Sequence, residues 1–72
     1  MNNKPQMKRE VSVTFHHEGV REIAFYSTPD AVTEFQQYGC VISSDKLRDY
    51  YRLIVDARYD FAEVLEFIQN YG

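Results

Sequence analysis

The sequence has few of the residues that stabilise very small proteins through cross-links. Its 72 residues include one cysteine, Cys40, so no internal disulfide can form. No Cys/His spacing typical of a zinc site is present, and the three glycines form neither a phosphate loop nor a nucleophile elbow. We therefore expect no metal, no cofactor and no enzymatic activity. Oligomerisation remains as a way to support so small a core.

The sequence also lacks a long apolar run. No stretch approaches the roughly 18 residues that a membrane span needs, and residues 1–6 do not resemble the apolar segment of a secretory signal. An unpaired cysteine is typical of a reducing compartment. These features predict a cytoplasmic protein with no membrane contact.

Basic residues are scarce after residue 9. Lys4, Lys8 and Arg9 have no acidic residue among them, whereas the rest of the chain holds five basic and eleven acidic residues, a net charge of −6. This asymmetry predicts a flexible basic tail over 1–9 and a single acidic domain over 10–72. Because an acidic body repels phosphate backbones, a protein is a more favourable partner for the folded part than a nucleic acid.

What the chain does contain is a regular alternation of apolar and polar residues. The alternation runs over 11–15 and again over 20–26 with a glycine between, which predicts a hairpin. The stretch 27–30 supplies a capping hydroxyl, a proline and an acid, the usual start of a helix. Gly39 suits the left-handed position that ends a helix, so a first helix is expected over 29–38.

The second half of the chain repeats this order. A short apolar run at 40–42 and a long alternating run at 50–59 predict a second hairpin, with Cys40 as a small buried residue. The polar stretch 43–49 is either a loop or a short helix. Asp60 is placed to cap a second helix, and Phe67 falls outside its inner stripe and is expected to be exposed. The expected inner stripe is Phe61, Val64, Leu65, Ile68 and Tyr71.

The two halves resemble each other when the sequence is shifted by 33 residues against itself, as an internal repeat of 11–39 and 40–72 would require. The identical pairs are Ala24 with Ala57, Tyr26 with Tyr59, Gln36 with Gln69, Tyr38 with Tyr71, and Gly39 with Gly72. Similar composition explains such matches as well as duplication does. In either case two strand-strand-helix units must share one core. The sequence predicts an α+β fold of order ββαββα, a four-stranded, mainly antiparallel sheet with two helices on one face.

The predicted interaction surface combines the sheet face that the helices leave open with the outer side of the second helix. Its residues are Tyr50, Arg52, Ile54, Asp56, Arg58, Glu63, Glu66 and Phe67. Mixed polar, aromatic and aliphatic side chains suit a protein contact better than open water. An apolar ring with an acidic rim on the helix would complement a basic groove on a partner.

These features predict a small, non-enzymatic protein-interaction or regulatory module that self-associates as a homodimer and binds another protein. Two alternatives stay open. One is a nucleic-acid-binding module in which the basic tail contacts the phosphates. The other is an acidic mimic of nucleic acid that occupies the site of a nucleic-acid-binding enzyme.

Overall fold

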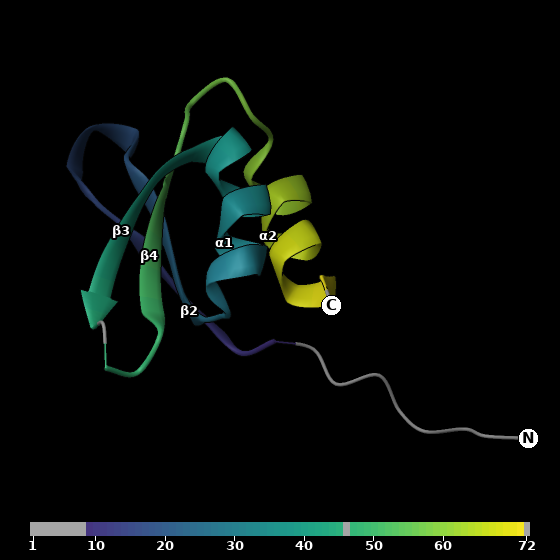
Figure 1. The fold of residues 1–72 in the computed structure, drawn as a ribbon. Coiled ribbons are helices and arrows are strands. Elements are labelled where there is room, and N and C mark those ends of the chain that lie inside the picture. Colours follow the sequence, from purple (N-terminus) through teal and green to yellow (C-terminus); the bar gives the residue numbers. More distant parts are fainter. Residues whose placement is uncertain (1–8, 46, 72) are drawn as a thin grey trace, which may run out of the picture.

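Two β-hairpins, each followed by a helix, make up the computed structural model of the chain (Figure 1). The structure describes residues 9–45 and 47–71, so most of the predicted basic tail lies outside the described residues. The elements are β1 (Val11–Phe15), η1 (His17–Gly19), β2 (Arg21–Tyr26), α1 (Pro29–Phe35), η2 (Gln36–Tyr38), β3 (Gly39–Asp45), β4 (Tyr50–Val55) and α2 (Phe61–Asn70), where η denotes a short 3-10 turn. Among the described residues, no helix is both long and apolar enough to cross a bilayer.

The four strands form one antiparallel sheet of order β1-β2-β4-β3. The second strand of each hairpin therefore lies in the centre, where Ile23 of β2 is opposite Leu53 of β4. Both helices lie beside the same face of this sheet (Figure 1). This arrangement confirms the predicted fold class.

The core lies between the helices and the covered face of the sheet. The largest fully buried side chains come from β2, α1, β4 and α2, and they are Phe25, Phe35, Ile23, Leu53, Ile68 and Val64. Burying each of them contributes roughly 1.5–3 kcal/mol before the loss of chain entropy is counted. Phe25 meets Phe35 edge to face, with ring centroids 5.2 Å apart. Because side chains alternate along a strand, the neighbours of these residues point to the open face.

The first helix begins and ends where the sequence predicts, but Gly39 has a different role from the expected one. Thr28 caps the helix, its Oγ1 accepting a hydrogen bond from the amide of Ala31 at 3.3 Å, and Pro29 is the first helical residue. The helical run continues through η2 to Tyr38. Gly39 has an extended φ of 161° and begins β3, so the left-handed cap prediction is wrong. Glycine is required there because a Cβ atom would collide with the carbonyl oxygen of Ile54.

The predicted boundaries of the second hairpin are also partly wrong. β4 ends at Val55 rather than at residue 59, because Asp56 starts a turn in which its Oδ1 accepts from the amide of Arg58 at 3.0 Å. β3 continues to Asp45, with an irregularity in its pairing near its end. Residues 47–49 then form a turn, so the described part of 43–49 is strand and turn rather than helix.

No single shift relates the two ββα units in the structure. β3 begins 28 residues after β1, whereas α2 begins 32 residues after α1. A shift of 33 pairs Tyr26 at the end of β2 with Tyr59 in the turn before α2, so this identity does not join equivalent positions. Whether the chain arose by duplication stays a prediction.

Candidate functional site

The residues predicted as one interaction surface lie on two opposite sides of the molecule. Tyr50, Arg52 and Ile54 alternate with the core-facing residues of β4 and therefore lie on the open face of the sheet. The side chains predicted on the second helix belong instead to the helical layer on the other face. The two groups therefore do not form one continuous surface.

Asp56 and Arg58 lie beyond the end of β4 and not within the strand as predicted, and they line a hollow together with Cys40 and Ile54 of the open face. They lie in the turn after β4, where the Arg58 Nη2 is 3.3 Å from Asp56 Oδ2. Hydrogen bonds from the backbone amide of Arg58, and next from its guanidinium, hold the pKa of Asp56 below its usual value. The contacts between these two residues stabilise the turn after β4.

A buried carboxylate, which sequence reasoning missed, lies at the centre of the open sheet face. Glu22 on β2 is 6% exposed. Its Oε1 is 2.9 Å from His16 Nε2 and 3.5 Å from Arg52 Nη1. Arg52 thus forms its ion pair with a carboxylate of its own chain. The sequence held one indication of this position. Glu22 and Ala24 are two residues apart on the same strand, so both side chains point to the open face.

The rest of the open face is partly apolar. Tyr26 is 53% exposed, and its ring centroid is 4.6 Å from that of Tyr50. Ile42 on the edge strand β3 is 38% exposed, and Cys40 beside it is exposed rather than buried as predicted. A hollow of about 300 Å³ is lined by Glu10, Val11, Ser12, Ala24, Tyr26 and Tyr50. We find no arrangement of groups in it that identifies a ligand.

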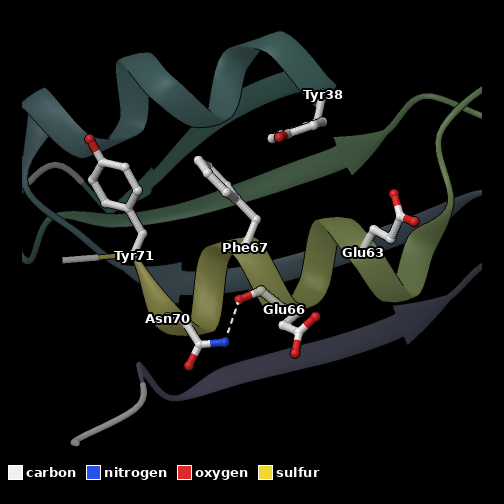
Figure 2. Close-up of a pocket in the computed structure, with 6 residues that line it drawn as sticks. All are labelled: Tyr38, Glu63, Glu66, Phe67, Asn70 and Tyr71. Atoms are coloured by element: carbon white, nitrogen blue, oxygen red, sulfur yellow. Dashed lines mark hydrogen bonds between the residues drawn. The ribbon is translucent and has the colours of Figure 1, made fainter.

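A larger groove lies on the helical side, between α2 and the end of η2 (Figure 2). Its volume is about 570 Å³, and it is lined by Tyr38, Glu63, Glu66, Phe67, Asn70 and Tyr71. The three predicted helix residues, Glu63, Glu66 and Phe67, therefore do come together. The sequence placed Tyr71 on the inner stripe of the second helix. The structure leaves both tyrosines only partly covered, so each contributes to the surface.

Aromatic rings form the floor of this groove. Figure 2 shows the Phe67 ring between those of Tyr38 and Tyr71, and its centroid lies 5.3 Å and 5.4 Å from theirs. Phe35, which is fully buried, supports this row, with its centroid 5.9 Å from Phe67 and 5.4 Å from Tyr71. Phe67 was expected to be exposed, and these contacts leave it half-buried.

Two carboxylates border the aromatic row, one on each flank of α2. Glu63 precedes Phe67 by four residues and lies on its side of the helix, whereas Glu66 is turned from Phe67 by about 100°. Figure 2 shows the same division, with Glu63 on the side of Tyr38 and Glu66 pointing away from it. Both are exposed, and neither forms an ion pair with any residue of 9–45 or 47–71.

The helical layer as a whole is acidic. α1, η2 and α2 contain Asp30, Glu34, Glu63 and Glu66, and they contain no lysine or arginine. The arginines of the described chain lie instead in the sheet, in the turns and next to the first strand. The part of the groove near Glu63 and Glu66 therefore lies in a field that attracts cations, whereas its Tyr71 end adjoins the Arg9 guanidinium.

Within the described residues, no three His, Cys, Asp or Glu side chains are grouped to hold a metal ion. No protein-family model, curated protein or solved structure matches this chain. The functional proposal therefore depends on the geometry and charge of the groove.

Proposed function

We propose that the chain is a small protein-interaction module that binds a basic segment of a partner protein in the groove along α2. One observation carries this proposal: a row of three partly covered rings lines the same groove as two carboxylates, and neither carboxylate has an ion-pair partner among the described residues. Aromatic side chains are enriched where proteins bind each other, and an acidic rim adds attraction for a basic partner.

The rigidity of the groove also supports binding. Phe67 is in contact with Phe35, Tyr38 and Tyr71, so its ring is already positioned before a partner arrives. A preorganised site loses less conformational entropy on binding than one whose side chains must first be ordered. Rings held in this way are the usual anchors of a small interface.

The acidic-mimic alternative is favoured by a separate observation, the lack of basic residues in both helices. A mimic of nucleic acid would depend on all four helical carboxylates and not on the rings. Nucleic-acid binding by the basic tail gains no support from the groove, because its carboxylates repel phosphates.

Two matched double variants separate these functions. Glu63→Lys with Glu66→Lys reverses the charges beside the groove, and Asp30→Lys with Glu34→Lys makes the same change in charge on α1. Each pair includes one residue of the first helical turn, so the loss of favourable helix-dipole interaction is similar in the two variants. Thermal melting followed by circular dichroism verifies that both variants fold.

The immobilised wild-type chain and both variants are incubated with lysate of the native host, and the retained proteins are quantified by mass spectrometry. We expect the groove variant to lose a retained protein by about tenfold or more while the α1 variant keeps it. Equal loss in both variants would favour the acidic mimic. Equal retention by all three chains would refute binding in the groove.

A further inference from the structure

We infer that the groove binds an arginine side chain of the partner, with its guanidinium stacked on Phe67 and paired with the carboxylate of Glu63. The inference rests on the proposed function and specifies the residue by which the partner is held. Lysine, with its compact ammonium, is the competing cation.

Guanidinium groups already lie over aromatic rings at three places in this chain. The centroid distances are 5.5 Å for Arg9 over Phe35, 5.4 Å for Arg21 over Phe61 and 5.5 Å for Arg58 over Tyr59. Within residues 9–45 and 47–71, no such cation lies over the rings of Tyr38, Phe67 or Tyr71. The groove therefore offers ring surface of the kind that binds cations elsewhere in the molecule.

The position of Glu63 favours a planar cation over a spherical one. Glu63 and Phe67 are four residues apart on α2, so their side chains lie one turn apart on the same side of the helix. A guanidinium can stack its flat face on a ring and still direct two N–H groups to a carboxylate. An ammonium has no flat face to stack. Glu66, on the other flank of α2, attracts the cation only at a distance.

The groove is wide and open to solvent, so a side chain can reach its floor together with its neighbours in the partner. Tyr38 and Tyr71 lie on either side of Phe67. The flanking rings can thus contact the apolar stem of the arginine and the adjoining backbone. Neither α1 nor α2 contains a lysine or arginine, and the Arg9 guanidinium, which donates to the carbonyl oxygen of Tyr71, lies at the end of the groove away from Glu63.

Three tripeptides that differ only at the central residue test this inference by NMR titration of the ¹⁵N-labelled chain. They are acetyl-Gly-Arg-Gly-amide and its lysine and citrulline counterparts, citrulline being an uncharged analogue of similar shape. We expect the arginine peptide to shift the amide signals of Tyr38, Phe67 and Tyr71, with a Kd in the millimolar range typical of so small a ligand. The lysine peptide should bind about threefold or more weakly, and the citrulline peptide should show no saturable shift.

Three protein variants show which carboxylate pairs with the arginine of the peptide. We expect Glu63→Gln to weaken the arginine peptide about threefold to fivefold and Glu66→Gln to weaken it less, because only Glu63 lies on the same side of α2 as Phe67. Glu34→Gln on α1 removes the same charge outside the groove and serves as the matched control, with an unchanged Kd expected.

Failure of the arginine assignment differs from failure of the groove. Equal Kd values for the arginine and lysine peptides, or equal effects of Glu63→Gln and Glu66→Gln, would refute the arginine–Glu63 pair and leave a general cation groove. If no peptide shifts the groove signals while the lysate protein still depends on Glu63 and Glu66, the arginine inference alone is wrong. If no peptide shifts the groove signals and no lysate protein depends on Glu63 and Glu66, both proposals are wrong.

Discussion

At the scale of single residues, Arg9 shows how one side chain can join parts of the chain that are distant in sequence. Its Nη1 donates to the carbonyl oxygens of Ile68 at 2.6 Å and Tyr71 at 3.2 Å, and its Nε donates to that of Tyr26 at 3.0 Å. A cation at the end of a helix also interacts favourably with the helix dipole. Although Arg9 was assigned to the basic tail, its side chain connects the end of α2 to the end of β2.

We expect Arg9→Met, which keeps an apolar stem but removes these donors, to lower the free energy of unfolding by about 2 kcal/mol. Urea denaturation followed by circular dichroism measures the change. Arg48→Met is the control, because Arg48 forms only an exposed pair with Asp45 at 3.7 Å, and its loss should cost less than about 0.5 kcal/mol. Equal midpoints for the two variants would mean that the Arg9 contacts contribute nothing to stability.

At the scale of elements, the start of β3 depends on close contact between two strands. Gly39 is opposite Val55 in the β3–β4 pairing, and the carbonyl oxygen of Ile54 occupies the space where a Cβ would lie. The amide of Asp56 also donates to the carbonyl of Tyr38 at 2.9 Å, next to this contact. The same few residues thus end the first helical run, begin β3 and end β4.

We predict that Gly39→Ala destabilises the fold by about 1–3 kcal/mol, because the added methyl group forces the two strands apart. Gly19→Ala is a control of a different kind: nothing lies within 4 Å of its Cβ position, but its φ of +78° is unfavourable for alanine. Its cost should be about 1 kcal/mol, from backbone strain alone. A Gly39→Ala variant with the urea midpoint of the wild type would contradict the close contact seen in the structure.

At the scale of the whole molecule, the open sheet face is where a second copy could bind. The charges at its centre are paired within the chain, through Glu22 with His16 and Arg52, so two such faces would not repel each other. Four strands about 4.8 Å apart and about 6 residues long present roughly 400 Å² of flat area. A flat area of this size is small for a protein interface, so any dimer should be weak.

The predicted self-association is tested by sedimentation velocity over a range of concentrations. We expect a reversible dimer with a Kd above about 10 μM, which Ile42→Lys shifts toward the monomer by placing a charge on the open face. Leu47→Lys is the matched control, because Leu47 is 96% exposed in the turn outside this face. A wild-type chain that stays monomeric at every concentration would show that the prediction of a homodimer is wrong.

The sequence by itself determined the order of the elements, the start of both helices and much of the core, but it also placed Cys40 and Tyr71 in the core, where the structure leaves them exposed. These features depend on local spacing: alternation in strands, the 3.6-residue period in helices, and the cap at Thr28 with Pro29 after it. Phe67 was found as a surface candidate for the same reason, since the helical period places it beside the stripe that contains Val64 and Ile68.

Only the tertiary structure decided which of these residues meet. Tyr38 and Tyr71 complete the groove because two helices from different halves of the chain pack side by side, and no local pattern specifies that contact. Long-range packing likewise placed His16 and Arg52 around Glu22 and set the position of Gly39 against Ile54. Periodicity determines which face a side chain occupies, whereas the neighbours on that face depend on how the elements pack together.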